Sequence, residues 1–168
     1  MDAFTSIRTK RDTRAYLPRP ILDETLHRIL QAGRMAGSSK NTQPCRFVVV
    51  RDEAQKRELA DCGQWATHVP AAPVVVAVIL TPGGGAFDAG RSAQNMMIAA
   101  WAEGITSCPT SMHNEACAAR VLNLPPEHRG AIVLPLAYPD SSATARRGHR
   151  RLPLEEFVHW EHWKDSSE

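Results

Sequence analysis

Two stretches in the first third of the chain carry side chains whose types and spacing suit a small polar ligand. The first holds three cations, Lys10, Arg11 and Arg14, with Asp12 among them. Arginine forms bidentate hydrogen bonds to phosphate, so this segment could hold an anion, although a solvated charged turn is the more common use of such residues. A second basic cluster lies at residues 146–151. If the two clusters converge, they form one phosphate-binding pocket.

The second stretch is the loop at residues 38–44, Ser-Ser-Lys-Asn-Thr-Gln-Pro, which runs directly into an apolar segment. Its hydroxyl and amide side chains can donate and accept hydrogen bonds, and Pro44 keeps the backbone before it extended. Such a loop at the end of a sheet suits a flat polar ligand. A capped loop that only feeds a strand is the alternative.

No nucleophile, carboxylate pair or metal cluster accompanies these binding groups. The sequence has no GxSxG motif, and its seven histidines are scattered. His159 and His162 could share a helix face, but they lack a third ligand. The glycines at 83–85 lack the GxGxxG spacing of a dinucleotide-binding turn. The chain therefore offers groups that bind and position, which predicts that a cofactor carries the reaction.

Length and composition indicate one globular domain over residues 1–168. The chain is 43% hydrophobic with a net charge of +2, which gives no general reason to expect nucleic acid or an anionic membrane as partner. The four cysteines show no CxxC and no zinc-type spacing, which predicts free thiols in a reducing compartment. The start lacks a signal-peptide pattern and no apolar run could span a bilayer, so we expect a cytoplasmic protein without a membrane partner.

Hydrophobic periodicity predicts the elements that position these groups. The run at 73–80 is apolar throughout, as in a strand buried on both faces, and Pro135 predicts a bulge or a partly edge position in another strand. Strands are expected at 46–51, 73–80, 105–108 and 130–138, and helices at 2–9, 23–36, 52–62, 88–103, 114–122 and 154–164. Strands alternating with helices, and helices at both ends, predict an α+β sandwich.

The end of the chain predicts an interface. The expected helix at 154–164 carries Phe157, Val158 and Trp160 as packing residues, and the helix at 88–103 has a face of small residues. Both features suit a dimer. A tail that folds back on its own core is the alternative.

Four stretches, taken in order, resemble motifs of the FMN-dependent nitroreductase family over almost the whole chain. They are residues 10–14 (the family's R-R-S-x-R), 38–44 (P-S-x-x-N-x-Q-P-W), 88–105 (a D-x-G-x-x-x-Q-N helix ending in G-L-G) and 151–156 (R-K-P-L-E-E). Any one match is weak, whereas four in order are specific. The resemblance implies a central, mostly antiparallel sheet flanked by helices, and an intertwined homodimer with the flavin at its interface.

The resemblance also implies which residues bind FMN. The implied set consists of Lys10, Arg11, Asp12, Arg14, Arg150 and Arg151 around the phosphate and ribityl chain, Ser38, Ser39, Asn41 and Gln43 along the isoalloxazine, and the backbone at Gly104, Ile105, Pro109, Thr110 and Ser111 against the flavin. No side chain is expected to act as a catalytic acid, base or nucleophile. Three departures are Asp12 where the family has Ser, Gly37 where it has Pro, and Cys45 where it has Trp.

The implied activity is an FMN-dependent oxidoreductase. NADH or NADPH would reduce the flavin and leave, and an electron-poor small molecule (a nitroaromatic, a quinone or an enone) would then take the electrons. Two alternatives stay open: a specialised flavin enzyme, either a reductive dehalogenase or one that consumes its flavin, and a module that binds a flavin or another phosphorylated ligand without turnover. Nucleic acid is disfavoured because the few aromatic residues do not interleave with the basic ones.

Overall fold

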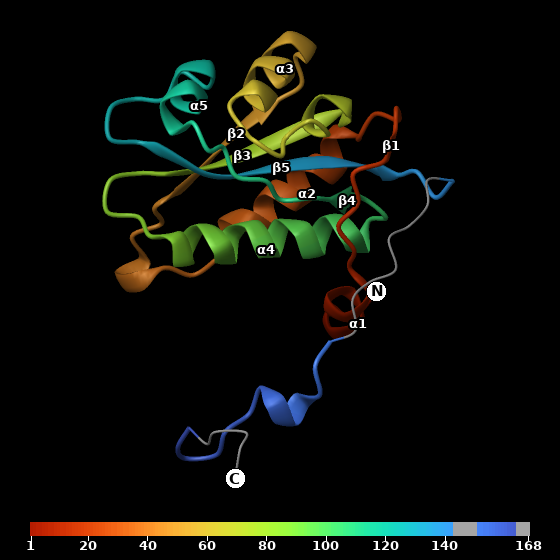
Figure 1. Ribbon diagram of the computed structural model, residues 1–168, viewed down its shortest axis with the longest axis vertical. Coiled ribbons are helices and arrows are strands. Elements are labelled where there is room, and N and C mark those ends of the chain that lie inside the picture. Colours follow the sequence, from red (N-terminus) through yellow and green to blue (C-terminus); the bar gives the residue numbers. More distant parts are fainter. Residues whose placement is uncertain (143–150, 164–168) are drawn as a thin grey trace.

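The computed structural model describes residues 1–142 and 151–163. Helices α2 and α4 cover one face of a central sheet, and α3 and α5 cover the other (Figure 1). In the described residues the helices are α1 (Ala3–Thr9), α2 (Asp23–Arg34), α3 (Glu53–Asp61), α4 (Ala86–Ala102) and α5 (Glu115–Val121), with 3-10 turns at Ser39–Asn41, Val69–Ala71 and Leu154–Glu156. The strands are β1 (Tyr16–Leu17), β2 (Cys45–Val50), β3 (Val74–Leu80), β4 (Thr106–Ser107) and β5 (Arg129–Pro139).

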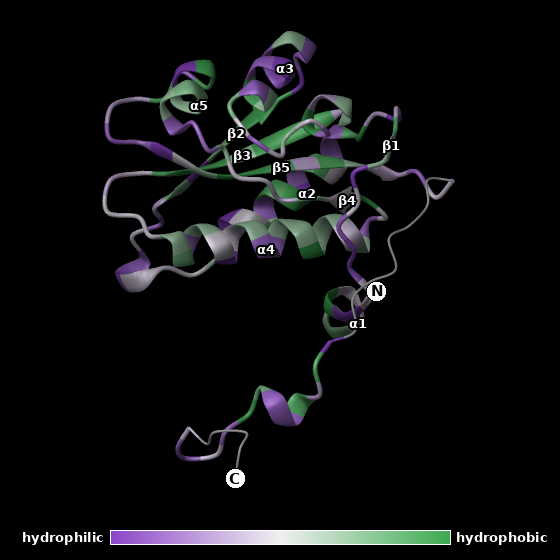
Figure 2. Cartoon of the chain, in the orientation of Figure 1, coloured by the Kyte–Doolittle hydropathy of each residue, from purple (hydrophilic) through white to green (hydrophobic). Residues whose placement is uncertain are grey.

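The sheet is antiparallel at every strand pair, in the order β1-β5-β3-β2, with the short β4 also paired to β5. All seven residues of β3 are buried, as its unbroken apolar run predicts. Val76 and Val78 pack into the core under α2 and α4, while Val75 and Ala77 pack into the core under α3 and α5. The middle of the sheet is accordingly its most apolar part (Figure 2). The α+β sandwich with a central antiparallel sheet is confirmed.

The bulge of β5 lies away from Pro135. The register between β3 and β5 shifts at Val78 and Ile79, whereas Pro135 pairs regularly with Val75. On the other side of β5, pairing with β4 ends at Leu136, and the next bridge joins Thr110 to Val133. Pro135 falls between these two contacts, where its missing N–H leaves no gap in a ladder. The prediction of a partly edge position is therefore right, and that of a bulge at the proline is wrong.

Helix α4 begins earlier than its sequence signals suggest and ends where they suggest. The Gly85 N–H donates to the Asp88 carboxylate at 3.1 Å, so this acid closes the first turn from inside the helix. At the other end Gly104 adopts a φ of 76°, the left-handed conformation that glycine accepts most easily. Helix α2 ends at Arg34 rather than just before Gly37, so residues 35–37 lead into the polar loop as non-helical chain.

The predicted terminal helix at 154–164 is wrong over the residues that the structure describes. Only the 3-10 turn Leu154–Glu156 forms, and the tail leads away from the sheet beyond α1 (Figure 1). Phe157 and Trp160, expected to pack, are 63% and 71% exposed. A short apolar segment needs a surface to pack against before its helix becomes stable, and the tail lies away from the sheet and its helices.

The prediction of four free thiols is also wrong. Cys62 and Cys117 form a disulfide, which joins the end of α3 to α5. Backbone geometry explains why: the Asn114 N–H, at the start of α5, donates to the Cys62 carbonyl at 3.0 Å. Residues 55 positions apart in sequence are brought together by folding, which spacing rules for local motifs cannot detect. Cys45 and Cys108 are free.

The part of the chain that the structure describes contains neither a cluster of metal ligands nor a candidate membrane-spanning helix. No three His, Cys, Asp or Glu side chains there gather closely enough to hold a metal ion. No helix there combines the length and the apolar composition needed to cross a membrane.

Candidate functional site

The basic segment 10–14 joins α1 to β1 and is fixed at the carboxyl end of α4. The indole N–H of Trp101, near the end of α4, donates to the Thr9 hydroxyl at 2.9 Å. The Thr106 hydroxyl in β4 donates to the Arg11 carbonyl at 3.1 Å, and Asp12 forms a parallel bridge with Ser107. Backbone and neutral side-chain contacts therefore help to position this corner.

The cations of this segment differ in how they are engaged. Lys10, whose side chain is only 12% exposed, forms an ion pair with Asp12 and also contacts the Met97 sulfur at 3.5 Å. The Arg11 guanidinium donates only to the carbonyls of Arg8 and Lys10 among the described residues. Neither Arg11 nor Arg14 forms an ion pair there. The two arginines are available to an anion, while Lys10 neutralises Asp12.

Neutral buried groups lie behind Arg14. Burial raises the pKa of the Cys108 thiol, with the Arg14 charge opposing this, and burial also raises the pKa of Tyr16. Burial lowers the pKa of His68. In the described structure the Tyr16 and Ser107 hydroxyls have no hydrogen-bond partner. All of these groups stay uncharged near neutral pH, so the arginines set the charge of this corner.

The loop 38–43 has a constrained backbone. Lys40, Asn41 and Gln43 adopt positive φ angles of 49°, 55° and 49°. The Ser38 hydroxyl oxygen accepts a 2.8 Å hydrogen bond from the Gln43 N–H and holds the loop closed. Left-handed conformations cost free energy in residues other than glycine and gather where a site must present its backbone in one arrangement. The loop therefore combines polar side chains with a fixed backbone, as loops that bind ligands often do.

The loop and the basic segment lie at opposite ends of α4 (Figure 1). The loop is tied to the end of β3, because the Thr81 N–H donates to the Pro44 carbonyl at 2.9 Å. Asp88, in the first turn of α4, lines the same cavity as Gln43. From Asp88 to Trp101 the helix rises roughly 20 Å, at about 1.5 Å per residue. One chain does not bring the two halves of the predicted flavin site together.

The other predicted site residues divide between the two ends and the tail. Ile105 is buried, and its N–H donates to the Ala100 carbonyl at 2.8 Å, so it lies at the carboxyl end of α4 with Gly104. The turn at Pro109–Ser111 follows β4 on the side of the basic segment, and its Thr110 pairs with Val133. Arg151 is exposed at the start of the tail, and Arg150 lies outside the described residues. Convergence of the two basic clusters stays a prediction.

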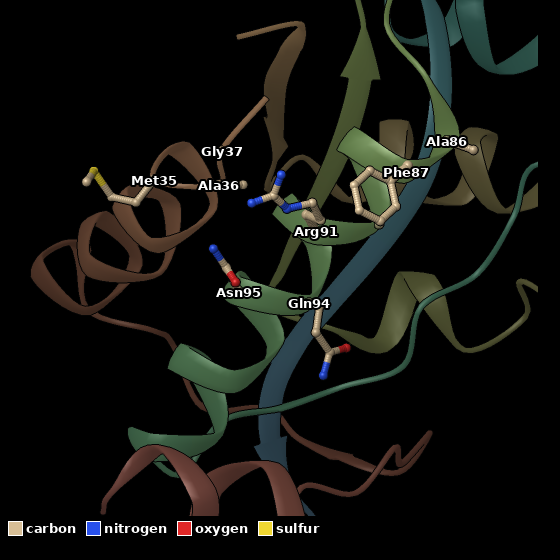
Figure 3. A pocket seen from close by; sticks show the side chains of 9 residues that line it. Met35, Ala36, Gly37, Ala86, Phe87, Arg91, Gln94 and Asn95 are labelled. Carbon is tan, nitrogen blue, oxygen red and sulfur yellow. The ribbon is translucent and has the colours of Figure 1, made fainter. Parts of the chain in front are cut away.

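Two cavities flank the loop and share Ala36 and Gly37. The first, of about 560 Å³, lies between the end of α2 and the first half of α4 (Figure 3). The second, of about 630 Å³, lies between α2 and β2 and includes Ser38, Gln43 and Cys45. Both volumes are in the range of small-molecule sites.

Sequence reasoning missed the first cavity. Its walls include Phe87 and Arg91 of α4, whose guanidinium carbon lies 5.5 Å from the Phe87 ring centroid. In the sequence, only the spacing of Phe87 and Arg91 pointed to this cavity. Four residues apart on a helix, the two side chains lie on one face. That signal does not indicate a ligand, because the opposite wall comes from residues 35–37, which follow α2 and are distant in sequence.

Comparison with known proteins identifies the family. The sequence profile of the nitroreductase family matches residues 7–80 and 82–138. The chain therefore belongs to the nitroreductase family, which confirms the predicted family and, with it, the prediction of an oxidoreductase.

Individual relatives agree with this assignment. An NADH dehydrogenase of Thermus thermophilus is 42% identical over 76 residues, which cover 45% of this chain and 37% of that protein. A Methanothermobacter thermautotrophicus protein, a candidate NADH dehydrogenase/NAD(P)H nitroreductase, is 28% identical over 97% of this chain and 88% of its own length. The NADPH:FMN oxidoreductase of Vibrio harveyi, solved with NAD+, superposes with a TM-score of 0.87 at 25% identity, covering 97% of this chain and 78% of that one.

Proposed function

We propose that this protein is an FMN-dependent NAD(P)H oxidoreductase that reduces small electron-poor acceptors. The observation that carries the proposal is the presence of both Arg11 and Arg14, which form no ion pair with a carboxylate among the described residues, and a constrained polar loop at 38–43. FMN needs both, because it joins a phosphate to a flat heterocycle with polar edges. The relatives, which include an NADH dehydrogenase and an NADPH:FMN oxidoreductase, support the same cofactor and donor.

The donor sets fit FMN at both ends. Arg11 and Arg14 would hold the phosphate and ribityl chain, and Arg151 would join them from the tail. Lys10 would act mainly by holding Asp12 away from the phosphate, since the two already form an ion pair. Ser38, Ser39, Asn41 and Gln43 would line the isoalloxazine. Gly104–Ile105 and Pro109–Ser111 would lie on the side of Arg11 and Arg14, which together form the proposed phosphate clamp.

Bound FMN would supply the redox chemistry, accepting hydride from a nicotinamide and passing electrons to an acceptor. The chain itself would bind, orient and set the electrostatics. Because the neighbouring side chains of Cys108, Tyr16 and His68 stay uncharged, none of them neutralises the positive charge of Arg14. Such preorganised charge favours a negatively charged ligand state.

We further propose that the flavin site forms between two copies of this chain. Within one chain a flavin that touched both halves would have to lie stretched along the whole of α4. In a two-fold dimer the basic segment of one copy meets the loop of the other, and symmetry creates a second identical site. Exposed apolar side chains support an interface: Phe4 and Ile7 on α1, and Leu154, Phe157, Trp160 and Trp163 in the tail.

The test is an absorption spectrum of the purified protein, followed by anaerobic addition of NADH and then NADPH. We expect a flavin band that bleaches with at least one donor and returns when a quinone or nitroaromatic is added. A flavin band that neither donor bleaches would indicate a carrier without turnover. A colourless protein that FMN does not reconstitute would contradict the proposal.

Product analysis separates the specialised alternatives. A reductase returns the same flavin after each cycle, whereas an enzyme that consumes its flavin depletes it in proportion to turnover. Halide release from a halogenated aromatic substrate would identify a reductive dehalogenase.

A further inference from the structure

We propose that the cavity between α2 and α4 binds the acceptor, and that Arg91 selects planar aromatic acceptors carrying a carboxylate or similar anionic group. This inference rests on the proposed function, because it places the acceptor beside the loop that would line the isoalloxazine. It goes further by naming the chemical class of the acceptor and the side chain that recognises it.

The position of Arg91 carries the argument. Its guanidinium points from α4 toward Ala36 and Gly37, with the Phe87 ring beside it (Figure 3). Among residues 1–142 and 151–163, Arg91 forms no ion pair with a carboxylate. A guanidinium held at a cavity wall without an acid partner presents its paired donors to an anionic group of a ligand.

The remaining walls favour a flat aromatic body. Phe87 is 76% exposed, and Met35 and Ala86 add apolar surface to the same cavity. An aromatic ring can stack on Phe87, and a thioether packs well against ring edges. Asn95 already donates to the Ala32 carbonyl at 3.2 Å, so its amide is fixed in the cavity wall. The cavity thus combines one cation with an aromatic and aliphatic surface.

Gly37 makes room for this arrangement. A Cβ atom at position 37 would lie 2.8 Å from a terminal nitrogen of Arg91, so any larger residue would displace the guanidinium. The family pattern noted above has Pro at this position, whereas this chain has Gly. The small residue lets Arg91 reach the start of the loop 38–43, beside which the acceptor would lie in the proposed site.

The experiment compares a charged and a neutral acceptor. The ratio of kcat/KM for para-nitrobenzoate to that for para-nitrobenzamide is measured in the wild type, Arg91→Gln and Gly37→Ala. Each nitro group consumes two NAD(P)H and two protons and yields the hydroxylamine, water and two NAD(P)+. We expect the ratio to fall about tenfold in Arg91→Gln and severalfold in Gly37→Ala. Arg57→Gln, which removes the same charge from α3 on the opposite face of the sheet, should leave it unchanged.

A direct binding measurement keeps the inference testable if the proposed activity fails. Fluorine NMR of para-(trifluoromethyl)benzoate should show weaker binding to Arg91→Gln than to wild type, with or without flavin reduction. Binding that is equal in the two proteins, or a kcat/KM ratio that does not change, would overturn the inference. A raised KM for NAD(P)H with an unchanged ratio would also overturn it, because the cavity would then serve the donor. Absent flavin with Arg91-dependent benzoate binding would instead contradict only the proposed cofactor.

Discussion

Single residues decide which of the predicted phosphate ligands are free to act. The sequence places Lys10, Arg11 and Arg14 close together, but it does not show that Lys10 forms an ion pair with Asp12. It also does not show that the groups behind Arg14 are buried and uncharged. The carboxylate that replaces the family's serine is therefore neutralised by Lys10 of the same chain, and in the proposed site the anion would be bound by the two arginines.

Replacing Arg14 tests this division. Arg14→Ala should weaken flavin retention at least tenfold, because a hydrogen bond to a charged group contributes about 1.5–3 kcal/mol. The measurement is the dissociation constant for FMN, by fluorescence quenching, with melting temperature as a folding control. Arg57→Ala, at the exposed Arg57–Glu53 pair of α3, should bind FMN like the wild type. Full flavin content and normal turnover in Arg14→Ala would show that the clamp lies elsewhere.

At the scale of elements, hydrophobic periodicity and end signals along the sequence predict the central strands and the helices that cover them. They do not predict contacts between elements that are distant in sequence. The apolar run of β3 and the glycine at the end of α4 are local signals, and both are confirmed. The disulfide between α3 and α5 depends on two helices meeting on one face of the sheet. Structural disulfides are typical of oxidising compartments, so this bond argues against the predicted reducing, cytoplasmic location, which stays a prediction.

Removing the disulfide should destabilise the protein. For cysteines 55 positions apart, loss of the cross-link is expected to lower the free energy of unfolding by about 4 kcal/mol in the chain-entropy account. Denaturant unfolding of Cys117→Ser measures the change, and wild type with reductant should approach the variant. Thiol titration of the denatured, unreduced protein should find two thiols, those of Cys45 and Cys108. Four thiols before reduction would show that the bond does not form.

At the scale of the whole molecule, the position of α4 separates the two halves of the predicted site. The resemblance names residues at both ends without saying which chain each serves. The tail at residues 151–163 does not pack on either hydrophobic core, and its aromatic side chains are exposed. Such side chains would suit a segment that packs on a second copy of the chain. One domain over residues 1–168 stays a prediction, as does the homodimer.

Complementation between two defective chains tests the shared site. One variant carries Arg14→Ala, and the other carries Asn41→Ala with Gln43→Ala; each is expected to bind little FMN by itself. Heterodimers isolated through two affinity tags should regain FMN at about one site per dimer, because one clamp and one loop remain intact and face each other. If the site lies within one chain, the heterodimer regains no flavin. A protein that light scattering finds monomeric would contradict the dimer itself.

The sequence by itself determined the family, the sheet strands of the core and the residue types that suit FMN, because these depend on short motifs and on periodicity along the chain. Only the tertiary structure decided that Lys10 pairs with Asp12, that Cys62 meets Cys117, that residues 154–163 form no packed helix, and that the basic segment and the loop lie at opposite ends of α4. These facts depend on contacts between residues distant in sequence. The cavity at Arg91 belongs with them, since one of its walls comes from residues 35–37 after α2 and the other from α4, which begins at Ala86.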